Sequence, residues 1–474
     1  MSDDGAQNRL VSLDVFRGMT IAGMVLVNNP GTWAHIYDPL EHASWHGLTP
    51  TDWIFPFFLF IVGIAIPIAL SKRIAEGVTG RVYWKIVSRA AIIFGLGLAM
   101  SVTPFFQFAA TDAPDGLKIL IWLAMTGGLF FLLLRNFKIA GALIAISIVG
   151  IIAMNLGGYN VVPYNFATMR IPGVLQRIAV CYLIVSLLFL HTNWKQQLGI
   201  AAALLLGYWA LMTLIPVPGC DVTTVNDKAC NLAAWLDRTI LTENHMWRSA
   251  KVFDPEGILS TIPAIVTTIS GVLTGTWLIR RGSEPPALAG GTNSGIAHDN
   301  ATKMDEITAT AISAGPSLPP AYAGGSDKVA GLFFFGTILL ALGYVWNSYF
   351  PMNKSLWTSS YVLATSGIAL LTLAACYWLI DIQGYKAWAK PFVIFGVNAL
   401  PLFVFSGIMA RMLGAYRVTG AEGQPVSVQK WIFDNIYLSI AQPVDASLMY
   451  AISFILLWLF LMWLLYRRRI FVKV

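Results

Sequence analysis

Long hydrophobic segments alternate with short polar loops along almost the whole chain. Each segment approaches the roughly 20 residues that an α-helix needs to cross a bilayer. Residues 104–116 and 391–410 contain proline and can be re-entrant, so ten or eleven spans remain alternatives to twelve. The pattern predicts an all-α polytopic membrane protein, a bundle of about 10–12 transmembrane helices. The expected spans are 12–30, 52–70, 86–103, 117–134, 139–156, 173–190, 198–215, 258–279, 329–349, 357–380, 391–410 and 446–466.

The overall composition supports this fold class. Of the 474 residues, 57% are hydrophobic and 12% are charged, whereas soluble domains carry about 25% charged residues. The apolar segments are also too long and too uniform for the strands of a membrane barrel. The net charge of +7 does not indicate nucleic-acid binding, because no basic stripe with interleaved aromatic residues accompanies it.

The basic residues instead indicate topology, because short cytoplasmic loops accumulate lysine and arginine. They cluster after alternate spans, which places both termini in the cytoplasm and the loop around His42 outside. The first nine residues lack the basic region and cleavage site of a signal peptide, so the first segment is expected to remain a membrane helix. The clusters contain Lys72, Arg73, Arg81, Lys85, Arg89, Arg135, Lys138, Lys195, Arg280, Arg281, Lys386, Lys390, Arg467, Arg468 and Arg469.

Residues 282–328 interrupt the hydrophobic pattern. They are rich in glycine, proline, alanine, serine and threonine, a composition that cannot bury a core and predicts a flexible cytoplasmic linker. The linker separates about eight expected helices from about four. Neither part shows a clear internal repeat, so residues 1–474 are expected to form a single transmembrane domain.

The four cysteines fall into two groups. Cys220 and Cys230 lie in the loop 216–257, which the charge rule places in the periplasm, where a disulfide can form. Two free thiols are the alternative. Cys181 and Cys376 fall inside expected spans and are interpreted as small core hydrophobes.

The polar loop between the first two spans carries three histidines, His35, His42 and His46. An interfacial histidine bonded to a backbone carbonyl is the ordinary interpretation of any one of them. For His42 the neighbouring residues favour chemistry instead. Asn28 ends the first helix facing the loop, and Asp52 begins the second, where a carboxylate suits the helix dipole. An imidazole beside an amide and a carboxylate can act as a base or a nucleophile near neutral pH.

Charged residues inside the first span form a second candidate site. Asp14 and Arg17 are three residues apart, so they share a helix face and can neutralise each other. A structural ion pair is one interpretation. In the other, the forked guanidinium of Arg17 faces a phosphate-bearing ligand near the cytoplasmic side.

Three further polar positions stand out in apolar surroundings. Arg177 follows Arg170 and Gln176 at the start of a helix, while Asp254 and Glu256 precede the eighth span. Acidic groups there are either dipole complements or contacts for a cationic or hydroxyl-rich substrate. Asn398 lies between proline and glycine residues and predicts a broken helix that lines a cavity. No metal-ligand spacing such as HExxH occurs, so no metal is expected.

Six segments together resemble one family. They read SLDVFRG, LVNN, EHASWHGLT, FPFFLFIVG, RIPGVLQR and DPEGILST, and they are similar to the signatures of the heparan-α-glucosaminide N-acetyltransferases, including bacterial members. The resemblance is strong from about residue 9 to 280 and weaker to the C-terminus. The family's lysosomal members carry an extra N-terminal luminal region, and its absence here fits the bacterial inner membrane.

The resemblance implies acetyl transfer from cytoplasmic acetyl-CoA to the amino group of a glucosamine residue across the membrane. His42 then matches the family's active-site histidine, and Asn28 matches the asparagine beside it. The glycine-rich stretch that usually follows that asparagine is replaced by Asn29-Pro30-Gly31, so the loop is expected to differ in shape. His42 is expected to act as a general base in a ternary complex, or alternatively to carry the acetyl group covalently.

The other site residues receive roles in the same scheme. Arg17, Arg177 and Asp14 are expected to bind the donor, and Asp254, Glu256, Asp52 and Asn398 the sugar. The expected partners are acetyl-CoA, an amino sugar and the bilayer, and a homodimer is compatible with the sequence. The alternative from another class is an amino-sugar transporter without acyl transfer, and a third is acyl transfer to a cell-envelope polymer.

Overall fold

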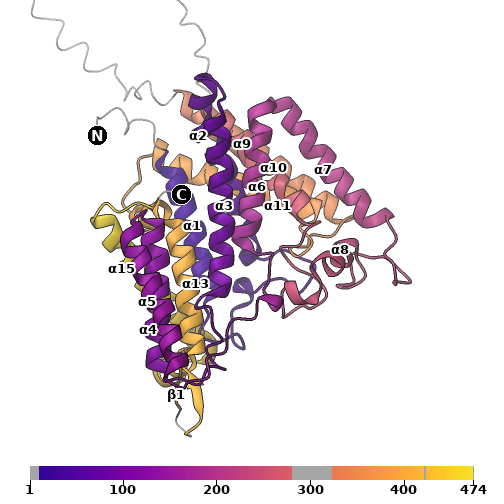
Figure 1. The fold of residues 1–474 in the computed structure, drawn as a ribbon. Coiled ribbons are helices and arrows are strands. Elements are labelled where there is room, and N and C mark those ends of the chain that lie inside the picture. The colour runs from indigo at the N-terminus through magenta and orange to yellow at the C-terminus, as the bar shows by residue number, and fades with distance from the viewer. Residues whose placement is uncertain (1–9, 280–322, 421–422, 473–474) are drawn as a thin grey trace, which may run out of the picture.

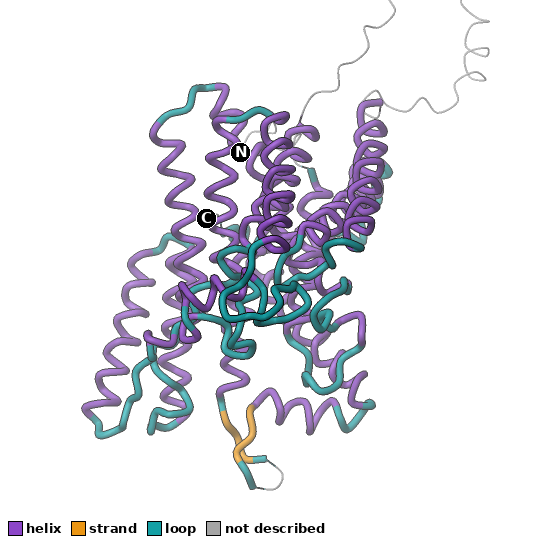
Figure 2. Tube along the Cα trace, turned by 90° about the vertical axis from the view of Figure 1, so that its right-hand side faces the viewer, coloured by secondary structure: helices purple, strands orange, loops and turns teal. Residues whose placement is uncertain are grey.

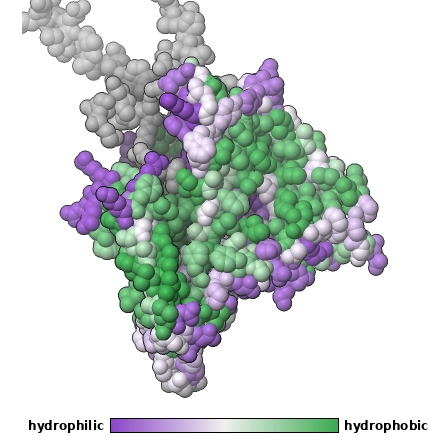
Figure 3. Space-filling model, viewed as in Figure 1, coloured by the Kyte–Doolittle hydropathy of each residue, from purple (hydrophilic) through white to green (hydrophobic). Residues whose placement is uncertain are grey.

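The computed structural model describes residues 10–279, 323–420 and 423–472. Helices dominate this part of the chain (Figure 1), and their apolar sides form a continuous hydrophobic surface between more hydrophilic ends (Figure 3). The longer helices are α1 (Val11–Asn28), α2 (Ile54–Ala75), α3 (Gly80–Val102), α4 (Asp115–Leu133), α5 (Phe137–Leu156), α6 (Val174–His191), α7 (Trp194–Leu214), α9 (Thr261–Ile279), α10 (Ala323–Asn347), α11 (Ser359–Cys376), α13 (Ala399–Ala415) and α15 (Pro443–Arg467).

The prediction of a polytopic helical membrane protein is confirmed. Eleven helices in the described residues are long and apolar enough to cross a membrane. A twelfth span results if α12 (Lys390–Val397) and α13 are counted together, although they meet at a bend of 83°. The break falls at Asn398, where the sequence predicts a broken helix.

Several short elements fall outside the predicted spans. Helix α8 (Leu232–Leu241) lies in the loop before α9, and α14 (Val428–Ile432) precedes α15. Strands β1 (Arg417–Thr419) and β2 (Pro425–Ser427) form an antiparallel hairpin at the lower tip of the molecule (Figures 1 and 2). Each is too short to show a hydrophobic period in the sequence.

The predicted linker needs one correction. Residues 323–328 belong to α10, which begins at Ala323, so the linker cannot extend to residue 328. The rest of the predicted linker, residues 282–322, lies outside the described residues. Helix α10 therefore begins six residues before the apolar run that starts near residue 329. Mean hydropathy does not detect these residues because they are not apolar enough to look like part of a span.

Two ends of the helix bundle can be distinguished by contacts. At the first, which we call the Arg17 end, α1 begins against the break between α12 and α13, because a Cβ on Gly396 would lie 2.1 Å from the Asp14 carbonyl oxygen. Asn398 at this break bonds to the backbone of Ile470. The start of α1 and the end of α15 therefore lie at the same end. At the other, the His42 end, α1 stops at Asn28 and α2 begins.

Helices α2 and α9 approach each other closely in the core. Gly63 and Gly271 face each other, with their Cα atoms so close that a Cβ on Gly271 would lie 2.1 Å from the carbonyl oxygen of Phe60. Small residues at such a crossing let two membrane helices approach and pack by van der Waals contact. This contact fixes the start of α2, and therefore Asp52, relative to the loop before α9.

Substitution of Gly271 by alanine is predicted to destabilise the fold, because the added methyl group overlaps the α2 backbone. Overpacking of this kind costs about 1–3 kcal/mol, which will appear as a lower apparent melting temperature in detergent. Gly95→Ala is the matched control, since its Cβ would have no heavy atom within 4 Å. Equal melting temperatures for the two variants would contradict the assigned helix contact.

Candidate active site

His42 and Asp52 form the centre of the candidate site at the His42 end. The His42 Nδ1 atom lies 2.7 Å from Oδ1 of Asp52. The imidazole side chain is 45% exposed, whereas that of Asp52 is 1% exposed. An ionised carboxylate only accepts hydrogen bonds, so Nδ1 carries the proton and donates it. The lone pair of His42 is therefore on Nε2, on the accessible imidazole.

Local structure holds Asp52 in this position. Residues Pro50–Trp53 form a 3₁₀ turn before α2, and Thr49 caps it with a capping box. The Oδ2 atom of Asp52 accepts bonds from the backbone amide (3.1 Å) and hydroxyl (3.0 Å) of Thr49 and from the amide of Ala43 (3.2 Å). The Tyr361 hydroxyl on α11 donates to the Asp52 carbonyl oxygen at 2.7 Å. Both carboxylate oxygens are thus satisfied before any ligand binds.

Lys354 is the third ionisable residue at this centre, and sequence reasoning missed it. Its Nζ atom lies 2.9 Å from Nε2 of His42 and 3.8 Å from Oδ1 of Asp52. Burial lowers the pKa of Lys354, although the Asp52 and Glu256 carboxylates oppose that shift. A lysine in a short loop on the side that the charge rule assigns to the outside was the available signal.

Three loops interlock around the pair. The Trp45 indole donates to the Val225 carbonyl at 2.9 Å, and the Gly47 amide donates to the Met352 carbonyl at 2.9 Å. His46 Nε2 lies 2.9 Å from Asn226 Oδ1, and burial lowers the pKa of His46 despite this bond. His46 therefore joins loops together, whereas His42 presents an imidazole to solvent.

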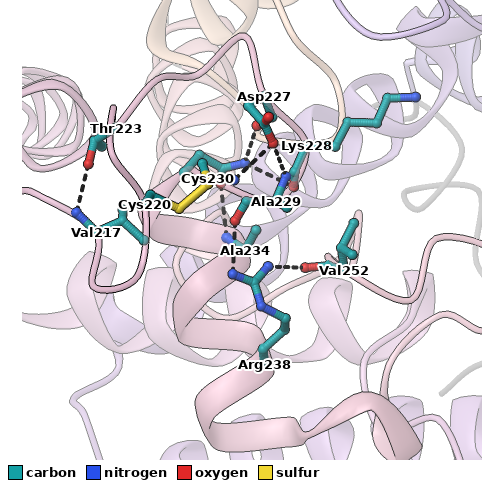
Figure 4. Close-up of a disulfide and its surroundings, with 11 residues drawn as sticks. Val217, Cys220, Thr223, Asp227, Lys228, Ala229, Cys230, Ala234, Arg238 and Val252 are labelled. Atoms are coloured by element: carbon teal, nitrogen blue, oxygen red, sulfur yellow. Dashed lines mark hydrogen bonds between the residues drawn. A yellow bond between two sulfur atoms is a disulfide. The ribbon is translucent and has the colours of Figure 1, made fainter.

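The loop that meets Trp45 and His46 is closed by a disulfide. Cys220 and Cys230 are bonded in the structure, as Figure 4 shows. The Asp227 carboxylate accepts the backbone amides of Ala229 (2.6 Å) and Cys230 (3.0 Å), and these bonds lower its pKa. Arg238 of α8 donates to the Ala229 carbonyl at 2.9 Å, which ties the closed loop to α8.

Arg170, Asp254 and Glu256 form a second charged cluster. Arg170 Nε and Nη2 donate to the two oxygens of Asp254 at 2.9 and 2.6 Å, and Nη2 also bonds Glu256. Burial alone would lower the pKa of Arg170, but the two carboxylates raise it. The carboxylates that sequence reasoning assigned to substrate are therefore already paired with one arginine. Any sugar contact they make must share that arginine.

Arg177 lies next to this cluster, deep in the core. It is 3% exposed, donates through Nη2 to Ser260 Oγ and to the Gly257 carbonyl, and packs 5.1 Å from the centroid of the Trp357 ring. Gly257 is also held against Asp237, because a Cβ there would lie 2.0 Å from the carboxylate. Burial raises the pKa of Asp237 to about 6. Arg177 thus lies at the His42 end, and Arg17 lies at the other.

The remaining predicted residues lie away from the pair. Asp14 and Arg17 approach to 3.4 Å, and Arg17 also reaches the Gly396 carbonyl at 3.5 Å. Asn398 donates to the Ile470 carbonyl and accepts from the Val472 amide, both at 3.0 Å. Asn28 is exposed, and no hydrogen bond joins it to His42 in the described structure. Its contact with His42 stays a prediction.

The described residues contain no group of three or more His, Cys, Asp or Glu side chains that could hold a metal ion. What the site does offer is a primary ammonium, an accessible imidazole and a buried carboxylate in mutual contact, with Lys354 Nζ 2.9 Å from Nε2 and 3.0 Å from Nδ1 of His42 and 3.8 Å from Asp52 Oδ1. Such an arrangement can remove a proton from an entering amine or hydroxyl group.

The region around the His42–Asp52 pair is similar to known proteins. Residues 9–168 match the family model of the heparan-alpha-glucosaminide N-acetyltransferase catalytic region. The human heparan-alpha-glucosaminide N-acetyltransferase is 26% identical to this chain, with 98% of this chain and 60% of that protein covered. The mouse protein of the same name is 24% identical, with 84% and 53% covered. The resemblance inferred from the six segments is confirmed.

The chain spans about 60% or less of the length of these two relatives. The region matched by the family model contains Asn28, His42 and Asp52, and it ends before Arg170. The Arg170 cluster and Lys354 therefore come from parts of the chain that the family model does not match.

Replacement of Arg170 by methionine is predicted to destabilise the protein strongly. The change leaves the Asp254 and Glu256 side chains, which are 0% and 10% exposed, without their cation. Breaking a buried pair in this way costs about 3–5 kcal/mol. The check is the yield of monodisperse protein and its melting temperature in detergent. Arg248→Met, at an exposed arginine nearby, is the control, and an equally small effect in both would refute the role of Arg170.

Proposed function

Because the chain is related to the heparan-alpha-glucosaminide N-acetyltransferases, we propose that it transfers acetyl from acetyl-CoA to the amino group of a glucosamine-type sugar. The observation that carries this proposal is the His42–Asp52 pair, an exposed imidazole held by a buried carboxylate. The pair lies within residues 9–168, which match the family's catalytic model.

His42 acts as the general base in this mechanism. Its Nε2 atom accepts a proton from the acceptor amine as the nitrogen lone pair attacks the acetyl carbon. The carbon–sulfur bond then breaks, its electron pair goes to sulfur, and the CoA thiolate takes up the proton from His42. Proton transfer by a positioned side chain contributes about 10²–10⁴-fold to a rate.

Asp52 orients His42. The 2.7 Å bond from Nδ1 keeps the imidazole in the tautomer whose Nε2 carries the lone pair, and the carboxylate stabilises the imidazolium during proton transfer. Asn28, which ends α1 and is exposed, is proposed to donate a hydrogen bond to the reacting carbonyl oxygen. That role follows from its match to the family's asparagine.

Acetyl-CoA is proposed to bind from the Arg17 end. Helix α1 has 18 residues and runs from Val11 to Asn28, so Arg17, eleven residues before Asn28, lies about 16 Å from it along the helix axis. Arg17 and Asp14 would contact the nucleotide, and the pantetheine arm would reach toward the His42 end of the bundle, where Arg177 lies. The acetyl group then passes to a sugar at the His42 end, with Asp254 and Glu256 as candidate sugar contacts. Asn398 lies at the Arg17 end and the Asp52 carboxylate is already bonded to His42, Ala43 and Thr49, so the sequence-based assignment of these two residues to the sugar is not kept.

The proposed location is the bacterial inner membrane, with both termini in the cytoplasm. The common position of the start of α1 and the end of α15, through Gly396 and Asn398, supports a shared side for the termini. The basic residues after alternate spans support the cytoplasm as that side. This orientation presents the Arg17 end to the cytosolic acetyl-CoA pool.

A transporter of amino sugars is the second candidate function. The 83° break between α12 and α13 favours it, because broken helices are typical of carriers. At this break, however, both polar ends of the Asn398 side chain bond the segment after α15. A carrier would accumulate sugar in vesicles without acetyl-CoA.

The proposed activity is tested with purified protein, labelled acetyl-CoA and a panel of amino sugars. Wild type is expected to release CoA and form N-acetylated sugar, and His42→Ala is expected to lose at least about 10²-fold in rate. His35→Ala is the matched control, because His35 is an exposed histidine of the same loop. Equal losses in both variants, or sugar uptake without acetylation, would overturn the assignment.

A further inference from the structure

The loop between α10 and α11 presents one lysine to His42. Its neighbour Asn353 is 0% exposed and folds the loop on itself. The Asn353 side-chain oxygen accepts a hydrogen bond from the backbone amide of Leu356 at 2.9 Å. The backbone amide of Asn353 donates to the Thr358 hydroxyl at 3.0 Å. Lys354 lies inside the segment 353–358 that these two bonds close, so its backbone has little freedom.

The following residues anchor the loop to the helix bundle. Leu356 and Trp357 are each 1% exposed. The Tyr208 hydroxyl donates to the Leu356 carbonyl at 2.6 Å, and the Trp357 indole donates to the Thr267 hydroxyl at 3.1 Å. Trp357 has a φ of 52°, a left-handed conformation that a bulky residue adopts only where the surroundings demand it. The loop is therefore a rigid mount for the Lys354 side chain.

The Lys354 ammonium lies where the reacting groups must meet. Its Nζ atom is 2.9 Å from Nε2 of His42, the atom that takes the acceptor's proton in the proposed function. An amine bonded to Nε2 and the acetyl carbon it attacks both have to lie within a few ångströms of that nitrogen. The Lys354 side chain is 23% exposed, so its flexible stem can yield to an entering sugar and stay beside it.

We propose that Lys354 is a further catalytic residue, whose ammonium binds the acetyl carbonyl oxygen and stabilises the oxyanion. The proposal rests on the acetyl transfer proposed above. Attack of the amine nitrogen on the acetyl carbon moves the carbonyl π pair onto oxygen, and Lys354 Nζ–H donates to that oxygen. Collapse restores the carbonyl group as the carbon–sulfur bond breaks, and Lys354 ends the step with the protons it had at the start.

The electrostatic setting suits this role. Asp52 lies 3.8 Å from Nζ and opposes the lowering of the Lys354 pKa by burial, while the rigid loop fixes the backbone that presents the ammonium. A preorganised donor for an oxyanion is worth more than one in water, because it does not have to reorient during the reaction. Asn28, proposed as the other donor, comes from α1, so the two would approach the oxygen from different elements.

The first test compares Lys354→Met with Lys251→Met, a change at an exposed lysine of a neighbouring loop. Lys354→Met is expected to lower kcat for acetyl transfer about 10²–10³-fold, with KM for the sugar within about threefold and the melting temperature unchanged. Lys251→Met is expected to keep the wild-type kcat.

The second test separates charge from shape by chemical rescue of Lys354→Cys. Alkylation with 2-bromoethylamine recreates a side chain of lysine length with an ammonium, and alkylation with 1-bromopropane gives an uncharged side chain of the same length. Only the first is expected to restore kcat. The other cysteines are either in the disulfide or buried, and wild type treated in parallel corrects for any reaction there.

Three results would overturn the role of Lys354. One is a Lys354→Met variant with wild-type kcat, and another is equal rescue by the two alkylating reagents. The third is acetylation of Lys354 Nζ, detected by peptide mass spectrometry after wild type is incubated with acetyl-CoA alone, since the amine would then be an acceptor. In each of these cases wild type still acetylates sugar. A wild type without activity on any amino sugar would overturn the proposed function as well.

Discussion

The buried carboxylate of Asp52 is the constraint on which the site depends. A charge removed from water costs several kcal/mol unless partners surround it, and the side chain of Asp52 is 1% exposed. Two of those partners, Thr49 and His42, come from its own loop, and a third, Lys354, comes from beyond α10. Because these groups satisfy Asp52, His42 is held with its Nε2 toward the accessible side.

The helix bundle contributes by fixing where the loops begin. The glycine contact between α2 and α9 sets the start of α2, which carries Asp52, beside the loop that contains Asp254. Arg170 pairs with the Asp254 carboxylate of the loop before α9. The disulfide closes the segment that bonds Trp45 and His46. The rigid surroundings leave the His42 imidazole as an accessible base, which is what preorganised proton transfer requires.

The sequence predicts the helices well because spanning segments are defined by local composition, which needs no knowledge of partners. His42 and Asp52 could be proposed together because ten residues separate them. Lys354 could not, since it lies 312 residues from His42, and only the packing of α10 and α11 brings it there. The pairing of Arg170 with Asp254 across 84 residues was missed for the same reason, whereas strands β1 and β2 were missed because three residues are too few to show a hydrophobic period.

The central claim is that one site connects an acetyl donor on one side of the membrane with an amine on the other. The most direct measurement uses sealed proteoliposomes, with labelled acetyl-CoA outside and glucosamine either enclosed or outside. The account predicts labelled N-acetylglucosamine when the two substrates are on opposite sides and little when both are outside. Equal product in the two arrangements would contradict transfer across the membrane.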